Sequence, residues 1–168
     1  MRKSALIRSA SFRPSGRIDL AIPELIHELA SLHQESGASD PEYPFVLSAG
    51  ERRSNTAMTL IRDPAWRKRD PLGALRISPH DARTLGVSDG ELVSVTTRRG
   101  QATAPVEITE MMRSGHVSLP NGYGLQHGPN GPIAGVAPNE LTDSSRRDWL
   151  AGTPWHKHVP ARLAKTSA

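Results

Sequence analysis

The chain has 168 residues and a mass of 18.2 kDa, which suits one domain with an appendage and is enough to bury a core. It contains no Cys, so disulfides, thiolate metal sites and a thiol nucleophile are excluded. Hydrophobic residues make up 36% and aromatic residues 4% of the chain, which predicts a modest aliphatic core. The net charge of +4 and the pI near 10.0 fit either an Arg-rich soluble surface or an anionic partner, namely nucleic acid, a nucleotide or an acidic protein face.

Targeting signals are weak in this sequence. No apolar run approaches the ~20 residues of a membrane span. The basic N-terminus lacks the apolar segment of a signal peptide. The expected location is therefore the cytoplasm.

The first predicted element is an amphipathic helix that begins at Pro23, because proline suits the first turn. Gly37 and the Asp40-Pro41 pair predict its end. Its apolar side chains share one face: Leu25, Ile26, Leu29 and Leu32. A single helix of this kind is not stable alone, so this face packs either on the rest of the chain or on a protein outside it.

A strand is predicted over residues 44–50, ending in small residues that let a ligand approach the backbone. The next residues combine Arg side chains, which suit phosphate, with neutral hydrogen-bonding side chains. The segment is either a ligand loop or an Arg-rich surface loop. The candidate ligand contacts are Ser48, Gly50, Arg53, Ser54, Asn55 and Thr56.

Residues 57–74 contain four cationic side chains near Trp66, together with two Asp-Pro pairs. Basic residues with an aromatic ring are typical of single-stranded nucleic-acid sites. One Trp is little support for such a site, and Asp-Pro pairs are turn signals. Nucleic acid is therefore not the expected partner.

Residues 75–120 carry the densest pattern. After a first strand, Ser78, Pro79 and Asp81 predict the capped start of a short helix, and Gly86 predicts its left-handed end. The Asp-Gly pair at 89–90 predicts a tight turn. Aliphatic residues then predict strands over 92–95, 102–108 and 116–119.

The C-terminal part reads mainly as loops. The Gly-rich residues 121–128 are not a dinucleotide fingerprint, because the third Gly falls one residue late and no helix follows. Asn139 offers a donor and an acceptor together, so it either contacts a ligand or caps a turn. Residues 159–163 predict a final strand. His156 and His158 would point the same way on an extended segment, but a metal site needs further ligands.

Together these motifs resemble the C-terminal molybdopterin-dinucleotide-binding domain of the molybdopterin oxidoreductases, the dimethyl sulfoxide reductase superfamily. The resemblance covers roughly residues 14–163. Its strongest segments are Ile-Ser-Pro-His-Asp-Ala-Arg-Thr-Leu-Gly-Val-Ser-Asp-Gly-Glu-Leu-Val at 77–93, Arg-Gly at 99–100, Ser-Gly-His-Val-Ser-Leu-Pro at 114–120, and the closing Asn-x-Leu-Thr and Gly-Thr-Pro-x-x-Lys signatures. In the family motif the proline and the aspartate adjoin, whereas here His80 separates Pro79 from Asp81.

The resemblance implies a mainly β fold with short helices, namely a double-psi β-barrel of the aspartate-decarboxylase-like kind with an N-terminal helical extension. It implies residues 1–40 as linker and helix, and residues 41–168 as the binding domain. The implied cofactor is bis-molybdopterin guanine dinucleotide with Mo or W, shared with domains not in this chain. The implied partners are the catalytic domains or subunit of a molybdoenzyme. They would supply the metal ligand, so we expect no activity from this chain alone.

The resemblance also implies cofactor contacts. The family places its first pterin-facing loop directly after the strand at 44–50. A Gly-rich segment beside the cofactor adds Asn121, Tyr123 and His127. Asn139 would lie on the pterin edge, and Lys157 near the end of the last strand. No catalytic residue and no metal ligand is assigned to this chain.

Two other functions remain open. A stand-alone basic β-barrel that binds nucleic acid would explain the pI. A barrel that binds a protein partner without cofactor would explain the missing catalytic body. Aspartate decarboxylase shares the barrel but cleaves itself at a Gly-Ser dipeptide, which this chain lacks.

Overall fold

The computed structural model describes residues 21–31, 40–51, 70–126, 129–131, 133–147 and 152–166. The chain divides into two compact units, residues 1–38 and residues 39–168. The first contains helix α2, Pro23–Ser31, which begins at the predicted proline. Leu32 lies outside the described residues, and the domain boundary after residue 40 stays a prediction.

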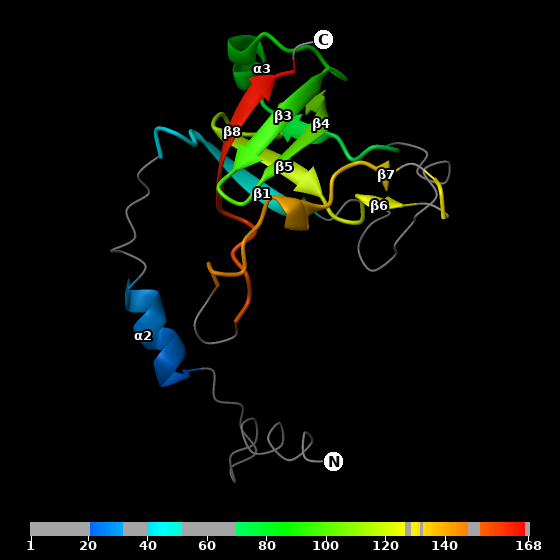
Figure 1. Ribbon diagram of the computed structural model, residues 1–168. Helices are drawn as coiled ribbons and strands as arrows, with labels where there is room; N and C mark the ends of the chain where they lie inside the picture. Colours follow the sequence, from blue (N-terminus) through cyan, green and yellow to red (C-terminus); the bar gives the residue numbers. More distant parts are fainter. Residues whose placement is uncertain are drawn as a thin grey trace. The chain divides into compact units, whose positions relative to one another are not determined.

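The second unit is a closed barrel of six strands (Figure 1). The strands are β1 Phe45–Glu51, β2 Leu75–Ile77, β3 Leu92–Thr97, β4 Gln101–Ile108, β5 His116–Pro120 and β8 Val159–Lys165. Around the barrel their order is β1-β5-β2-β4-β3-β8. The pairs β1/β5 and β2/β4 are parallel, and the other pairs are antiparallel. The strands predicted from the sequence are confirmed.

Aliphatic side chains fill the barrel because successive residues of a strand point to opposite faces. In β3, Val93 and Val95 are fully buried, whereas Leu92 is exposed. The fully buried residues from the other strands include Leu47, Ala49, Leu75, Ile77, Ala104, Val106, Val117, Leu119, Pro120 and Ala161. This is the aliphatic core that the composition predicts.

Helix α3, Pro79–Leu85, forms where its capping residues predict it. The Ser78 hydroxyl accepts a hydrogen bond from Asp81 N at 3.1 Å, and Gly86 ends the helix with φ 65°. The buried Asp81 carboxylate in turn accepts hydrogen bonds from Ser78 Oγ at 2.8 Å, Ser114 Oγ at 2.7 Å and Gly115 N at 2.8 Å. One carboxylate therefore joins the start of α3 to the chain that enters β5.

The opposite end of the barrel carries the short 3-10 helix η3, Pro138–Glu140. Figure 1 shows α3 at one end and the orange segment that contains η3 at the other. Just before η3, strands β6, Leu125–Gln126, and β7, Ile133–Ala134, form an antiparallel pair. Within the described ranges, no helix combines the length and the apolar character needed to cross a membrane.

Candidate functional site

The carboxyl end of β1 is held by two segments that are distant in sequence. The Gly50 carbonyl oxygen accepts hydrogen bonds from Lys157 Nζ at 3.0 Å and from Asn121 Nδ2 at 3.0 Å. The Asn121 backbone N–H also donates to Glu51 O at 2.9 Å. Three of the predicted site residues therefore lie together, because the side chains of Asn121 and Lys157 both bond to Gly50.

Close backbone contacts make this arrangement specific. Gly50 has φ 89°, and a Cβ there would lie 2.7 Å from Asn121 Oδ1, so a larger residue would push the amide away. One residue earlier, Ala49 N donates to His156 O at 2.7 Å. Ser48, also a predicted contact, is half-buried in β1. The end of β1, Asn121 and the 156–157 segment are thus fixed as one unit.

Lys157 lies two residues before the last strand, which begins at Val159, and its contact with the cofactor stays a prediction. At that position its ammonium group reaches across to the Gly50 carbonyl of β1. This contact between β1 and the segment that enters the neighbouring strand β8 cannot be read from the order of residues along the chain.

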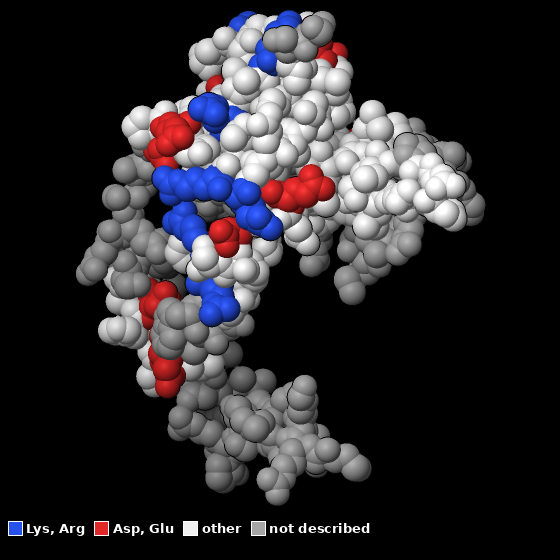
Figure 2. Space-filling model, in the orientation of Figure 1, with Lys and Arg blue, Asp and Glu red and all other residues white. Residues whose placement is uncertain are grey.

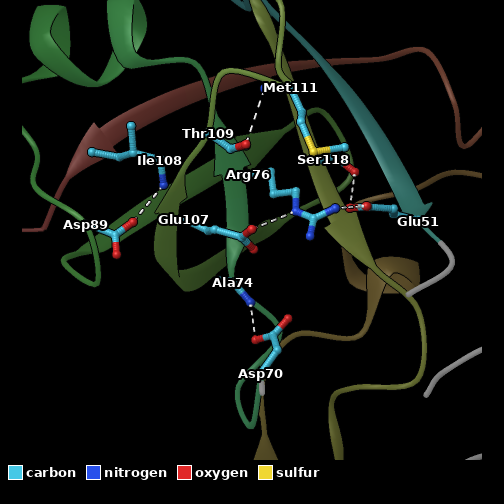
Figure 3. Close-up of polar contacts among 10 residues, drawn as sticks. All are labelled: Glu51, Asp70, Ala74, Arg76, Asp89, Glu107, Ile108, Thr109, Met111 and Ser118. Carbon is cyan, nitrogen blue, oxygen red and sulfur yellow. Dashed lines mark hydrogen bonds and ion pairs between the residues drawn. The ribbon is translucent and has the colours of Figure 1, made fainter. Parts of the chain in front are cut away.

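An ion-pair ladder on the outside of the barrel fixes the residue at which the chain leaves β1 (Figure 3). The Arg76 guanidinium of β2 forms an ion pair with Glu51, and its Nε donates to Glu107 Oε1 at 3.0 Å. Ser118 Oγ donates to Glu51 Oε2 at 2.8 Å. Glu51 immediately precedes the predicted ligand loop, so the ladder sets the starting point of that loop.

A cavity of about 530 Å³ opens beside η3. Its lining residues are Arg99, Asn139, Thr142, Asp143, Ser144, Pro154 and His156. Asn139 is exposed, and within the described part of the chain its side-chain amide makes no hydrogen bond. Hydroxyl and amide groups that remain available suit a heterocycle whose edge mixes donors and acceptors.

A second cavity of about 200 Å³ shares Arg99 and Asp143 with the first. It is more cationic, because Arg98 and Arg146 also line it, beside the half-buried Trp155. Figure 2 shows a face of the molecule on which Lys and Arg side chains gather, with acidic side chains among them. The two cavities therefore differ in chemistry although they adjoin.

Thr97 connects the β3–β4 turn to the segment after η3. Its buried hydroxyl donates to Leu141 O at 2.9 Å and accepts from Arg99 N at 3.2 Å and Gly100 N at 3.3 Å. These bonds hold the turn that carries Arg99 next to the segment that carries Asn139, and both residues line the same cavity.

Replacing Thr97 with Val keeps the side-chain volume but removes the hydrogen bonds of the hydroxyl. We expect the free energy of unfolding to fall by about 1–3 kcal/mol, because the buried Leu141 carbonyl and two partly buried backbone N–H groups lose their partner. Urea denaturation measures this fall. The control is Thr96→Val on the other face of β3, and equal effects for the two variants would contradict the role given to Thr97.

Of the remaining predicted contacts, the structure describes only Tyr123. Tyr123 is 2% exposed, and its hydroxyl donates to Asp70 O at 2.7 Å, so its side chain packs inside the protein. The others lie outside the described residues, and their roles stay predictions: Arg53, Ser54, Asn55, Thr56 and His127.

Asn139 was predicted as a ligand contact, whereas the other six residues that line the larger cavity were not, Arg99 and His156 among them. The sequence indicates Arg99 only as part of a turn and His156 only as half of a His pair. Their position next to Asn139 depends on how the β3–β4 turn and the 154–157 segment pack around η3. The available sequence signal was the pair of arginines at the tip of a predicted hairpin.

Residues 45–160 match the family model described as Molydopterin dinucleotide binding domain. The F420-dependent formate dehydrogenase subunit alpha of Methanocaldococcus jannaschii is 33% identical over an alignment of 92 residues, and the match covers 48% of this chain and 12% of that protein. The periplasmic nitrate reductase of Desulfovibrio desulfuricans is 29% identical over an alignment of 83 residues, and the match covers 48% of this chain and 11% of that protein.

Among solved structures, acetylene hydratase from Pelobacter acetylenicus has the same fold with a TM-score of 0.67 and 20% identity. That match covers 94% of this chain and 24% of the hydratase chain. This chain thus spans a small part of the length of each relative. The shared fold and the closed mixed barrel confirm the predicted double-psi β-barrel. Since the family match covers well over half of the chain, the chain belongs to the Molydopterin dinucleotide binding domain family of the molybdopterin oxidoreductases, as its sequence motifs predict.

Proposed function

We propose that this chain positions a molybdopterin guanine dinucleotide cofactor inside a larger molybdenum or tungsten oxidoreductase. The observation that supports the proposal is the cavity beside η3, where Asn139, Arg99 and His156 converge from three separate segments. The cavity adjoins the segment whose Lys157 and His156 hold the end of β1. A ligand in the cavity would thus meet a preorganised wall.

The groups present fit such a cofactor. A pterin edge needs neutral donors and acceptors, and the cavity offers the Asn139 amide with the hydroxyls of Thr142 and Ser144. When bound, the cofactor supplies redox chemistry at its metal, and the protein supplies binding and orientation. In the proposal this chain binds and orients the pterin and excludes water from it.

The proposal places the rest of the enzyme outside this chain. Bis-molybdopterin guanine dinucleotide with Mo or W would be shared with catalytic domains or a catalytic subunit, which carry the metal ligand. Residues 41–168 are the proposed binding domain, and residues 1–40 the link to those partners. The assembly is proposed to work in the cytoplasm, and this chain is proposed to be inactive alone.

The test isolates the tagged chain from its native source and follows molybdenum and tungsten by plasma mass spectrometry across size fractions. We expect the metal to elute with this chain at a mass well above 18.2 kDa. Asn139→Ala should lower the metal and pterin content per chain by about tenfold, because loss of one or two hydrogen bonds to a buried ligand costs about 1.4 kcal/mol.

The matched control is Asn130→Ala, since Asn130 is exposed and lines neither cavity. It should keep the wild-type content. A metal-free chain that elutes near its own mass, or equal content in the Asn139 and Asn130 variants, would contradict the proposal. Turnover of a dye acceptor by the purified chain alone would also contradict it, because the proposal assigns the metal ligand and the catalysis to other domains.

A further inference from the structure

The tip of the β3–β4 turn lies against the segment that leads into β1. Arg98 Nη2 donates to Asp40 Oδ2 at 2.5 Å, and the Arg98 guanidinium lies 5.6 Å from the centre of the Tyr43 ring. A guanidinium can make both contacts at once, since its donors lie in its plane and a ring meets its face. A carboxylate and a ring from one short turn, residues 40–43, therefore hold the same side chain.

This entry turn, residues 40–43, orders its own carboxylate. Asp40 Oδ1 accepts a hydrogen bond from Glu42 N at 3.0 Å, and Tyr43 N donates to Asp40 O at 3.0 Å. Pro41 restricts the backbone at the second position of the turn. Because Asp40 is already ordered, its ion pair with Arg98 costs less side-chain entropy than an ordinary surface pair.

The β3–β4 turn is also attached to the segment that contains η3. The Thr97 hydroxyl donates to Leu141 O at 2.9 Å, and a Cβ at Gly100 would lie 2.8 Å from Glu140 O. Glycine permits this close approach because it has no side chain. The turn is thus held by two separate segments, and Arg99 between these attachments lines both cavities.

We propose that Asp40 and Arg98 are positioning residues for the cavity beside η3, and that their ion pair keeps Arg99 in place as part of the cavity wall. This inference rests on the proposed function of that cavity. Without the ion pair, the β3–β4 turn keeps its contacts with the η3 segment but loses its attachment to the entry turn. Arg99 then samples more positions, and a ligand must restrict it again, at a cost in affinity.

The ion pair is too exposed to act mainly on global stability. The Arg98 side chain is 67% exposed, and an ion pair with a partner of this exposure changes the free energy of unfolding little. Its effect is expected on the turn that it holds, because a local contact governs local opening more than global unfolding. A positioning role and a merely structural role therefore predict different measurements.

The first measurement is hydrogen exchange in the full chain at the amides of Arg99 and Gly100, which both donate to Thr97 Oγ1 and report opening of the turn. Arg98→Gln and Asp40→Asn should each accelerate this exchange about threefold, as expected for the loss of an exposed ion pair. The double variant should exchange like Arg98→Gln alone, because Asp40 acts on the turn through Arg98.

The second measurement is the metal and pterin content per chain in the native assembly. Arg98→Gln should lower this content about threefold at a nearly unchanged free energy of unfolding, and Arg98→Lys should restore most of it. The matched control is Lys165→Gln, which removes the exposed ion pair with Glu91 at the end of the barrel that carries α3 (Figure 1). The control should change neither the exchange of the turn nor the cofactor content.

Equal exchange in the wild type and Arg98→Gln would mean that the ion pair does not hold the turn, and the inference would be wrong. Faster exchange with unchanged cofactor content, or an equal loss of content in Lys165→Gln, would overturn the positioning role alone. Absence of cofactor from the wild-type assembly would overturn the proposed function and this role with it. The comparison of exchange with content therefore distinguishes the two failures.

Discussion

Replacing Gly124 with Ala is expected to lower both the stability of the barrel unit and its cofactor content. Gly124 has φ 76°, and a Cβ there would lie 2.3 Å from Ala137 N and 2.5 Å from Ala137 Cβ. The left-handed conformation costs a residue with a Cβ about 1–2 kcal/mol, and overpacking adds about 1–3 kcal/mol. Ala137 directly precedes η3, so relief of the collision would displace Asn139.

Gly90→Ala is the matched control. Gly90 has φ 80°, but a Cβ there would have no heavy atom within 4 Å, so this variant carries the conformational cost alone. Urea denaturation compares the stability of the two variants, and the metal content is measured in the native assembly of each. The difference between the variants gives the cost of the collision with Ala137, since both carry the backbone strain. Equal losses of stability, or an unchanged cofactor content in Gly124→Ala, would show that the contact with Ala137 does not position η3.

Replacing Asp81 with Ala is expected to remove the connection between α3 and the start of β5. The Asp81 side chain is 7% exposed and accepts from Ser78, Ser114 and Gly115. Loss of the acceptor leaves these donors unsatisfied, and the free energy of unfolding should fall by roughly 3 kcal/mol. The control Asp89→Ala should cost only about 1 kcal/mol, because Asp89 is exposed and accepts one bond, from Ile108 N (Figure 3).

The same carboxylate predicts a pH dependence. Burial raises the pKa of Asp81, but hydrogen bonds from Ser114, Ser78 and Gly115 outweigh burial and hold the pKa below its ordinary value of 3.8. Because the native pKa lies below the unfolded pKa, the ionised Asp81 carboxylate stabilises the fold fully at pH values above the unfolded pKa. This stabilisation is lost as the pH falls through the native pKa. Urea denaturation at a series of pH values should therefore show the wild type losing its advantage over Asp81→Asn below about pH 4. An advantage that does not change with pH would mean that the charge contributes nothing.

Local signals in the sequence were sufficient to predict most of the helices and strands of the barrel unit. Ser78, Asp81 and Gly86 act within one short segment, so the caps of α3 depend little on the rest of the fold. Strands such as β3 and β4 follow from the alternation of aliphatic residues and from the turn between them. The motif order then predicted the family and the barrel.

The sequence could not predict the side-chain partners at the site, because these join segments far apart in the chain. Lys157 and Asn121 both meet the Gly50 carbonyl only because β1 pairs with β5 in parallel and with β8 in antiparallel orientation. Tyr123 looked available in a Gly-rich loop, yet the fold buries it and its hydroxyl bonds to the Asp70 backbone.

The sequence by itself determined the kind of domain, the positions of its strands along the chain and the choice of Asn139 as a candidate contact. Only the tertiary structure distinguished Arg98 from Arg99, which are chemically identical neighbours. Asp40 lies far from them in sequence but close to Arg98 in space, and it neutralises that arginine while Arg99 faces the two cavities. The strength of a charge at a site depends on which opposite charges lie near it, and closure of the barrel determines those neighbours.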